Sequence, residues 1–535
     1  MIFRQSSSLA SRLVTAALAA AVTVLSGSFA MADGVNLSRR IDSNNYDPQK
    51  STATAAAEVL FMLGDTLVSL DYDMTSLHPG LAKSWDVSAD GLTYTFHLRD
   101  DVKFCDGRAM TADDVAYSFN RWINPATKSP VAWRAGEVDS ITATDKDTVS
   151  YKLKKPFSEL LYQLTQSFAI VIDKNTVEKL GDNFGVSGFN GTGPFCWGEW
   201  RPRDKMVLNR NPAYTWGPEI YANRGPAKVD SVTWSIIGEE NTLTAALMTG
   251  QTDASNYVPP IALQQFSTMP GFVSSTSKSA RYTYFLGFKL DKQTVKDLAV
   301  RQAINYAVDR VALVQDQMYG TVTPAYSYIT EDTLDWNPDV DKVLIKDFDP
   351  EKAKTLLDQD GWKVGSDGIR EKNGVKLAPV LYSFNGAWTN IDQDIQAELL
   401  KVGINLQIQV FDATVAWGKL ATQEFDMFTM GYPYFSAGDA MNLYFRSGNT
   451  PAPNRTNWKD PETDALLASG SAATSNAERA KDFGKVLYKV HDAVNWLPLY
   501  HAPIIIVQTD KLKPMKAHPI YGAAFYKGLD LEFVK

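Results

Sequence analysis

Helical and strand patterns follow one another along the chain, and this limits the fold class more than any other feature. Ile391, Ile395 and Leu399 recur every four positions, which is typical of one buried helix face. Gly403 is a residue that commonly ends a helix. Directly after it, every second residue of the segment 404–410 is apolar, which predicts a strand. A helix that runs straight into a strand is typical of mixed α/β folds.

The same alternation occurs elsewhere in the chain. Apolar residues occupy every second position from Leu92 to Leu98, which predicts a half-buried strand. Thr111 precedes Asp113 and Asp114, and such residues favour the start of a helix. Apolar residues every four positions over residues 300–311 predict another helix. Helices and strands interleaved from end to end predict the α/β class.

The first 32 residues have the pattern of a secretory signal peptide. Arg4 and Arg12 give a basic start, an apolar core follows over residues 13–25, and Ala30-Met31-Ala32 supplies the small residues that a signal peptidase reads. The apolar core is shorter than the ~20 residues that span a bilayer. No cysteine lies near the cut, so we expect no lipid anchor. We predict cleavage after Ala32 and a periplasmic protein.

The charge balance argues against nucleic acid as a partner. The chain has 53 basic and 61 acidic residues, and residues 1–32 hold Arg4 and Arg12 but no acid, which leaves 51 against 61 and a net charge of −10. Such a chain, without a basic stripe, repels a polyanion. Hydrophobic residues make up 44% of the chain. With about 500 mature residues, this predicts a globular protein of two or three domains.

The chain has two cysteines, Cys105 and Cys196. In an oxidising compartment an even pair predicts one disulfide, and two buried unlinked thiols remain the alternative. A metal site is a weaker interpretation, because two isolated cysteines and five scattered histidines form no ligand cluster.

Several motifs resemble, in residues and in order, those of one bacterial family. They are Leu77-His78-Pro79-Gly80-Leu81-Ala82-Lys83-Ser84-Trp85, Asp90-Gly91-Leu92-Thr93-Tyr94-Thr95-Phe96-His97-Leu98-Arg99, Val102-Lys103-Phe104-Cys105-Asp106-Gly107, Gly191-Thr192-Gly193-Pro194-Phe195, Asn209-Arg210-Asn211-Pro212-Ala213-Tyr214 and Arg301-Gln302-Ala303-Ile304-Asn305-Tyr306-Ala307-Val308-Asp309-Arg310. Across nearly the whole mature chain, this set is similar to the dipeptide/oligopeptide/nickel-type extracellular solute-binding proteins, family 5, of ABC importers. Because proline and glycine place turns and alternating aromatics bury a strand face, we expect these motifs to build the scaffold.

The resemblance implies a periplasmic-binding-protein-like fold of type II, cluster C, with two hinged lobes and an extra lobe. By analogy, residues 33–76, 190–275 and 500–535 form lobe I, residues 77–189 the extra lobe and residues 276–499 lobe III. It implies a ligand held between lobes that close over it, and a permease of an ABC importer as partner. We expect a monomer that carries no cofactor.

Two loops depart from the peptide-binding pattern of the family. In residues 431–442, peptide-binding members resemble a Gly-Trp pair followed by an Asp that holds the peptide ammonium. Here that position falls at Phe435 or Ser436, and Asp439 aligns with a later acid. Dipeptide binders also carry an Arg for the peptide carboxylate where this chain has residues 382–388, which contain none. Because an unpaired buried charge costs several kcal/mol, these losses argue against a zwitterionic peptide.

Aromatic and amide side chains take the place of those charges. They favour a neutral oligosaccharide or sugar conjugate, with a di- or oligopeptide as the alternative, because flat rings suit sugar faces and amides suit hydroxyls. Candidate pocket residues are Asn385, Trp388, Trp417, Tyr432, Tyr434, Phe435, Ser436 and Asp439. Core packing is the alternative for each aromatic, and Trp388 and Tyr432 are the preferred pocket residues.

Family analogy adds three further places to the predicted chamber. Thr52 and Thr54 would offer hydroxyls from lobe I, Trp133 and Arg134 would reach in from the extra lobe, and Arg281 lies near the start of lobe III. For both arginines a solvated surface position is the alternative.

Catalysis is the competing class of function. Ser275 and Lys278 match a Ser-x-x-Lys pattern, but no Lys-Thr-Gly follows, and neither Gly-x-Ser-x-Gly nor His-Glu-x-x-His occurs. We therefore expect a binding protein and keep a secreted serine hydrolase as a remote alternative. The five histidines show no helical pairing, so we expect no direct metal site, and a metal held by a bound chelator stays open.

Overall fold

The fold is that of a computed structural model, which describes residues 33–520 and 522–535, without the side chains of Ala387, Ala413, Thr414 and Trp417. The predicted signal peptide, residues 1–32, lies outside the described residues. Helices and strands alternate along the chain, which confirms the α/β class.

Lobe I is built around a seven-stranded sheet. The strand order is β12 (Phe272–Thr276), β22 (Ile505–Thr509), β11 (Ala254–Ser255), β1 (Gly34–Arg39), β10 (Ser231–Ile236), β9 (Lys205–Arg210) and β8 (Phe195–Arg201). The central strand β1 runs parallel to both of its neighbours, β10 and β11. Helices α5 (Glu240–Met248) and α6 (Pro260–Phe266) pack beside β12 and β22 around Leu243, Phe266 and Val507.

The extra lobe contains an antiparallel sheet in the order β4 (Ala82–Val87), β5 (Thr93–Leu98), β7 (Thr148–Leu153) and β6 (Val138–Ala143). Strand β5 buries every second residue, which confirms the predicted half-buried strand. Helix α2 (Ala112–Ile123) begins after Thr111, whose side chain and that of Asp114 cap it reciprocally. The short helices η2 (Ala132–Ala135), α3 (Leu160–Gln163) and α4 (Lys174–Leu180) complete the lobe.

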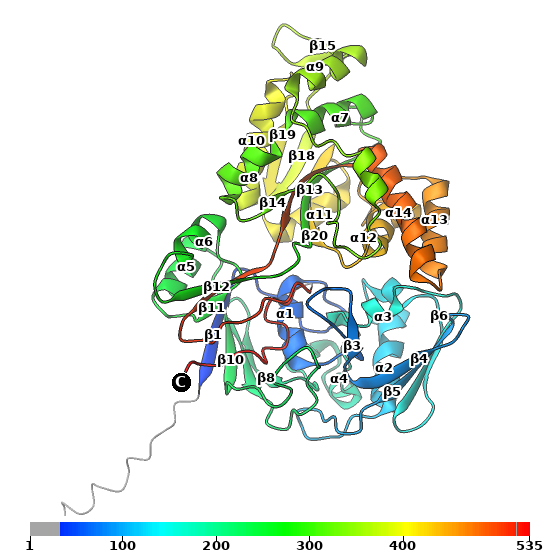
Figure 1. Ribbon diagram of the computed structural model, residues 1–535, viewed down its shortest axis with the longest axis vertical. Helices are drawn as coiled ribbons and strands as arrows, with labels where there is room; N and C mark the ends of the chain where they lie inside the picture. Colours follow the sequence, from blue (N-terminus) through cyan, green and yellow to red (C-terminus); the bar gives the residue numbers. More distant parts are fainter. Residues whose placement is uncertain (1–32, 521) are drawn as a thin grey trace, which may run out of the picture.

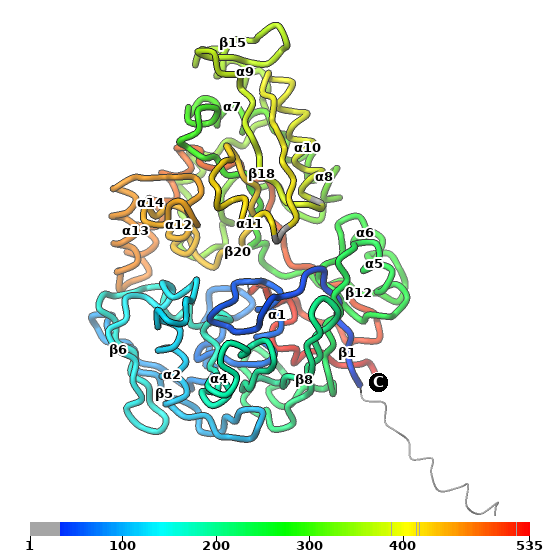
Figure 2. Tube along the Cα trace, turned by 180° about the vertical axis from the view of Figure 1, so that it is seen from behind, coloured from blue at the N-terminus to red at the C-terminus, as the bar shows by residue number. Residues whose placement is uncertain are grey.

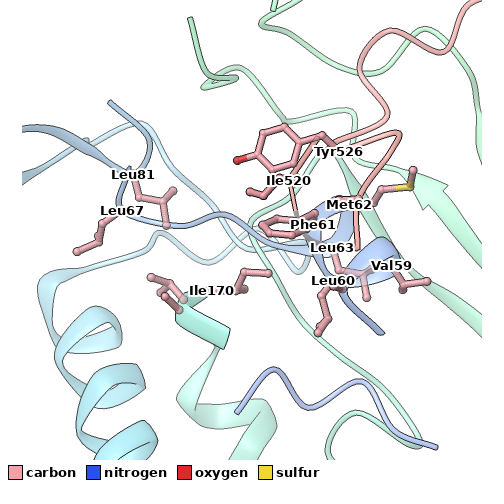
Figure 3. Packing of buried hydrophobic residues seen from close by; sticks show 14 of the residues in the cluster. Val59, Leu60, Phe61, Met62, Leu63, Leu67, Leu81, Ile170, Ile520 and Tyr526 are labelled. Atoms are coloured by element: carbon pink, nitrogen blue, oxygen red, sulfur yellow. The ribbon is translucent and has the colours of Figure 1, made fainter. Parts of the chain in front are cut away.

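Lobe I and the extra lobe share one hydrophobic core. Helix α1 (Thr54–Leu63) buries nine of its ten residues. One of the nine is Glu58, which pairs with the buried Arg39. Figure 3 shows its Phe61 and Leu63 among Leu81 and Ile170 of the extra lobe and Tyr526 near the C-terminus. Strands β2 (Val68–Leu70) and β3 (Leu77–Pro79) also pair across the predicted boundary. The two lobes therefore form one body, and their exact division stays a prediction.

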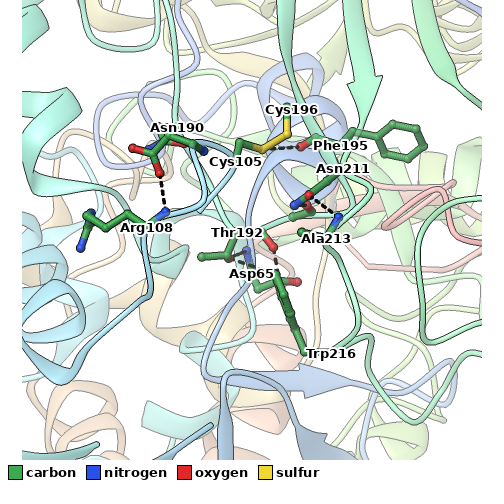
Figure 4. The surroundings of a disulfide bond; sticks show 12 residues. Asp65, Cys105, Arg108, Asn190, Thr192, Phe195, Cys196, Asn211, Ala213 and Trp216 are labelled. Atoms are coloured by element: carbon green, nitrogen blue, oxygen red, sulfur yellow. Dashed lines mark hydrogen bonds between the residues drawn. A yellow bond between two sulfur atoms is a disulfide. The ribbon is translucent and has the colours of Figure 1, made fainter. Parts of the chain in front are cut away.

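A disulfide joins Cys105 to Cys196, with 5.8 Å between the Cα atoms, and this confirms the predicted bond. Cys105 lies in a loop of the extra lobe and Cys196 in β8 of lobe I (Figure 4). The backbone N–H of Cys105 also donates to the carbonyl of Gly191 at 2.9 Å. The bond fastens the extra lobe to lobe I.

Lobe III has a six-stranded mixed sheet with helices on both faces. The order is β14 (Thr323–Pro324), β21 (Trp496–Ala502), β13 (Tyr282–Phe288), β20 (Met427–Pro433), β18 (Val380–Phe384) and β19 (Gln407–Phe411). One core cluster includes residues of α7 (Leu298–Ala307), α8 (Arg310–Met318), α9 (Pro350–Gln359) and α10 (Ala387–Leu400). The other includes residues of α11 (Ala413–Thr422), α12 (Ala437–Phe445), α13 (Pro461–Ala472) and α14 (Asn476–Asp492). A small hairpin sheet, β15 (Lys363–Val364), β16 (Arg370–Lys372) and β17 (Val375–Lys376), projects at the far end (Figure 1).

The single helix predicted over residues 300–311 is wrong in its length. Helix α7 ends at Ala307, and the side chain of Asp309 accepts hydrogen bonds from the backbone N–H groups of Val311 and Ala312. These bonds start the separate helix α8, because an aspartate cap satisfies the amides of a helix beginning. Val311 is consequently 53% exposed instead of buried.

Two adjacent chain segments connect lobe III to the body (Figure 1). One leads from β12 to β13, and the other returns from β21 to β22. They are held together where the backbone N–H of Ser277 donates to the Ile504 carbonyl at 2.8 Å and the Ile504 N–H donates to Ser277 Oγ at 2.9 Å. Such a paired connection is a natural hinge for lobe closure.

Candidate ligand-binding site

The carboxyl ends of parallel strands from lobe I and lobe III come together. Arg40 follows β1, and Gly386 follows β18, which runs parallel to β19 and β20. A Cβ placed on Gly386 would lie 3.9 Å from Arg40 Nη2. In open α/β sheets, ligands bind outside the carboxyl ends of the strands. We call the place where Arg40 approaches Gly386 the Arg40 opening. It is the first candidate ligand site.

The Arg40 opening combines a partly exposed arginine with the start of a helix. Arg40 Nη1 makes an ion pair with Glu240, and its side chain is 33% exposed. Gly386, with a φ of 114°, is the residue before α10, a 14-residue helix. Because glycine has no side chain, it cannot cap the first N–H groups of this helix. An uncapped helix start and a guanidinium both favour an anion. No motif marked Arg40 in the sequence, because its role depends on a residue 346 positions away.

Two predicted pocket residues border this opening. Asn385 is exposed, and Trp388 is half-buried. The Trp388 ring meets the rings of Tyr284 and Phe384 edge-on at 5.0 and 5.4 Å. Thr54 begins α1, and Thr52 is exposed just before it. The side chain of Trp417 lies outside the described residues, so its predicted role stays a prediction.

Three other predicted residues meet at the junction of the extra lobe and lobe III. Arg134, from η2, donates from Nη1 to Asp439 Oδ1 at 2.7 Å and to Gln163 Oε1 at 2.9 Å. Its Nη2 donates to Tyr432 Oη at 3.0 Å. The side chains of Arg134 and Asp439 are buried. The two charges predicted to face a ligand thus pair with each other across the lobes.

A second buried arginine extends this network. Arg479 on α14 lies 2.9 Å from Asp335 Oδ2 and 3.3 Å from Glu159 Oε1 of the extra lobe. Ser436 Oγ donates to Glu159 Oε2 at 3.0 Å. Burial raises the pKa of Glu159 to about 7, and burial also raises the pKa of Asp335 and Asp439. No sequence motif marks Glu159, Asp335 or Arg479, because their charges meet only in the fold. We call the five charged residues of both groups the junction network: Arg134, Asp439, Arg479, Glu159 and Asp335.

Three of the remaining predicted side chains are enclosed, whereas Trp133 is 43% exposed. Phe435 stacks on Tyr162 of the extra lobe at 6.1 Å, and Tyr434 is 1% exposed. Arg281 is buried and donates to Ser279 Oγ at 2.7 Å and to the Phe435 carbonyl at 3.3 Å. These contacts favour packing for Tyr434, Phe435 and Arg281, and their role toward a ligand stays a prediction.

The Ser-x-x-Lys pattern has no catalytic geometry. Ser275 lies in β12, paired with Ile506, and Lys278 follows in the hinge segment. On a helix, residues three positions apart share a face, so the lysine would lie beside the serine. On a strand, residues three positions apart point to opposite faces.

In residues 33–520 and 522–535, no cluster of three or more His, Cys, Asp or Glu side chains is arranged to hold a metal ion. No helix in the same part of the chain has the length and apolar character needed to cross a membrane.

A paired hinge, two lobes that meet at their parallel strand ends and an extra lobe fixed to one of them define the type II periplasmic-binding-protein fold. Residues 76–453 match the family described as "Bacterial extracellular solute-binding proteins, family 5 Middle". The chain belongs to this family, whose members bind small ligands and deliver them to the permease of an ABC importer.

Individual relatives agree in length and fold. The chain is 26% identical over 489 residues to the oligopeptide-binding protein AppA of Bacillus subtilis, covering 88% of this chain and 86% of that protein. It is 27% identical over 494 residues to the glutathione-binding protein GsiB of Pectobacterium atrosepticum, covering 89% and 88%. The crystal structure of NikZ from Campylobacter jejuni with Ni(L-His) superposes with a TM-score of 0.81 at 24% identity, covering 94% and 99%. The first two relatives are named for the ligands that they bind, and the third structure holds a nickel–histidine complex.

Proposed function

We propose that this chain is the periplasmic solute-binding component of an ABC importer and that its ligand is a short peptide. The predicted preference for a sugar finds no support among the reported relatives, whose names give an oligopeptide, glutathione and a nickel–histidine complex. The aromatic residues that suggested a sugar are largely engaged in packing, as Tyr434 and Phe435 show. The peptide alternative therefore becomes the main proposal.

The Arg40 opening carries this proposal. The loop at residues 382–388 lacks an arginine of its own, but Arg40 Nη2 of lobe I faces Gly386 in that loop. A guanidinium and the N-terminus of α10 together form a suitable place for a peptide carboxylate. The charge that the loop lacks is supplied from the opposite lobe.

A thermal-shift screen tests the ligand class. We expect di- to pentapeptides to raise the melting temperature, because a ligand at a hundredfold excess over Kd stabilises the native state by about 2.7 kcal/mol. Oligosaccharides and sugar–amino-acid conjugates serve as the competing set. Stabilisation by sugars and by no peptide would refute the peptide proposal.

Arg40→Gln tests the carboxylate contact directly. We expect the variant to bind the best peptide about tenfold more weakly, since a charge-assisted hydrogen bond is lost. The C-terminal amide of that peptide should bind wild type and variant alike. Arg201→Gln, which removes an exposed ion pair with Asp204, is the matched control and should leave both affinities unchanged.

The site of action also remains a proposal. N-terminal sequencing of the exported protein should begin at Asp33 if the signal peptide is cut after Ala32, as predicted. Retention of residues 1–32 would contradict it.

A further inference from the structure

A buried carboxyl group lies directly behind the Arg40 opening. Asp392 is the sixth residue of α10, the helix whose start faces Arg40, and its side chain is not exposed to solvent. Figures 1 and 2 show α10 beside β18 in lobe III. Because a helix rises about 1.5 Å per residue, Asp392 lies about 9 Å behind the helix start. A charge on this side chain therefore acts on any anion held at the opening.

Two hydroxyl groups hold one oxygen of this carboxyl group. Ser383 Oγ of β18 is hydrogen-bonded to Asp392 Oδ2, and Thr429 Oγ1 of β20 donates to the same oxygen at 3.2 Å. Ser383 and Asp392 are nine positions apart, and Gly386 lies between them in the chain. The side chain of Asp392 thus ties together the two ends of the loop that carries Gly386.

No positive group is paired with this carboxyl group. In the part of the chain that the structure describes, Asp392 has no ion pair, and its Oδ1 has no hydrogen-bond partner. Because an ionised carboxylate is costly to bury without a partner, the neutral acid is favoured here. Burial raises the pKa of Asp392 to about 7, although the hydrogen bonds from Ser383 and Thr429 lower it. Near neutral pH a proton is therefore gained or lost at this position.

The elements packed around α10 do not supply the missing charge. Helix α10 contacts β18, β19, α7 and α8. The basic residues of α7 and α8 are Arg301 and Arg310, which both donate to backbone carbonyls, and Asp316 of α8 is exposed. The titratable group that faces Asp392 is the hydroxyl of Tyr500 on β21, and burial raises the pKa of that hydroxyl. A neutral tyrosine cannot balance a carboxylate.

The two other acids of α10 have different surroundings. Gln317 Nε2 donates to Asp394 Oδ2 at 2.5 Å, and the backbone N–H of Asp309 donates to Glu398 Oε2 at 3.1 Å. Asp394 and Glu398 are half-buried, whereas Asp392 is enclosed. The cost of ionisation is therefore greatest at Asp392.

We propose that Asp392 holds a proton while a ligand carboxylate occupies the Arg40 opening, and that loss of this proton weakens the binding of the ligand. The neutral acid donates from Oδ2 to Ser383 Oγ, which in turn donates to the Phe384 carbonyl at 3.4 Å. The ionised acid instead accepts from Ser383 and adds a negative charge behind the helix start, where it opposes a second anion. Asp392 is thus a positioning residue that makes ligand affinity depend on pH. This link to a ligand rests on the proposed function.

Infrared difference spectra of the full chain test whether Asp392 carries the proton. The spectrum of wild type minus that of Asp392→Asn should show a carboxylic-acid C=O band at pH 5 that is lost by pH 9, since asparagine resembles the neutral acid but does not titrate. The variant Asp394→Asn, changed on the same helix, is the matched control and should retain the band. A missing band at pH 5, or a band that persists at pH 9, would overturn the proposal.

Calorimetric titration with alanyl-phenylalanine tests the link to the ligand. The affinity of wild type should fall relative to that of Asp392→Asn by about fivefold between pH 5 and pH 9, because the ionised group repels the ligand carboxylate. Titration of the peptide's own amino group affects both proteins alike, so the ratio of the two affinities isolates Asp392. The C-terminal amide of the same dipeptide has no carboxylate, and its affinity ratio should not change with pH.

The outcomes for this proposal and for the proposed function are distinguishable. If alanyl-phenylalanine binds with an affinity ratio that stays constant with pH, the proposed function stands and the role of Asp392 is refuted. If neither this dipeptide nor its alanine-extended tri- to pentapeptides bind at either pH, the proposed function is refuted, and the link to a ligand with it. The infrared band still decides in that case whether Asp392 holds the proton.

Discussion

Lobe III meets the rest of the protein at two places of unlike chemistry. The junction network buries five charged side chains between lobe III and the extra lobe. The Arg40 opening presents one partly exposed arginine to the backbone of Gly386. At the first place, charged side chains of the two lobes pair with each other. At the second, Arg40 is paired with Glu240 of its own lobe and faces the positive end of a helix in lobe III.

We infer from this difference that one place governs the closure of the lobes and the other the recognition of the ligand. Parting the lobes at the junction network would break ion pairs such as Arg134–Asp439, and uncompensated buried charges are costly. The Arg40 opening has no such pair across the lobes among its described contacts, so a ligand anion would be the group that joins them there. We infer that the junction network sets the geometry of the closed lobes and that the Arg40 opening selects what they enclose.

The largest effect is expected from Arg479→Met. Loss of this cation leaves Glu159 and Asp335 buried without their partner, and breaking a buried pair in this way costs about 3–5 kcal/mol. Denaturant unfolding measures the change. Lys342→Met, which removes an exposed pair with Asp339, is the control and should leave the unfolding free energy almost unchanged. Similar losses of unfolding free energy in both variants would mean that the ion pairs of Arg479 stabilise the fold no more than an exposed ion pair does.

The second-largest expected effect is a dependence of the unfolding free energy on pH, which Glu159→Gln should remove. The pKa of Glu159 is raised to about 7, so the folded protein holds this proton more tightly than the unfolded chain does. Its contribution to stability should therefore be present below about pH 4.5 and decline as the pH rises to about 7, by about 3 kcal/mol.

The groups facing Glu159 are Arg479, Asp335, Asp439 and Ser436, and each remains in the variant. The difference between wild-type and variant unfolding free energies, measured from pH 4 to pH 8, isolates Glu159. A difference that does not change with pH would contradict the prediction.

A smaller effect is expected from Tyr432→Phe. This change removes only the oxygen that accepts from Arg134 Nη2, and a hydrogen bond to a charged group contributes about 1.5 kcal/mol or more. Tyr319→Phe, at a side chain that is 41% exposed, should shift unfolding by less than about 0.5 kcal/mol. If Tyr432→Phe unfolds no more easily than this control, Tyr432 is not part of the junction.

The smallest stability effect belongs to the Arg40 opening. Asn385 is exposed, so Asn385→Ala should change the unfolding free energy by less than about 0.5 kcal/mol while weakening the binding of the best peptide. Asn175→Ala, at an exposed residue of α4, should change neither quantity. Unaltered peptide affinity in Asn385→Ala would place the ligand elsewhere.

Local patterns in the sequence were enough for the scaffold but not for the site. The strand at β5, the helix after Thr111 and the disulfide depend on spacing, capping and compartment, which are readable along the chain. Arg134 and Asp439 were each predicted to face a ligand, but they neutralise each other across 305 positions. Pairing of this kind depends on lobe packing, which no local pattern encodes. For the same reason the sequence showed neither Arg40 nor Glu159.

The place of β22 has a consequence for the order of assembly. All strands of lobe III lie between residues 282 and 502, so that lobe is encoded by one continuous stretch. The sheet of lobe I, by contrast, has β22 between β12 and β11 and stays divided until residues 505–509 arrive. Contacts between distant residues form slowly. We therefore expect the sheet of lobe I to be completed only when β22, the last strand of the chain, pairs with β11 and β12.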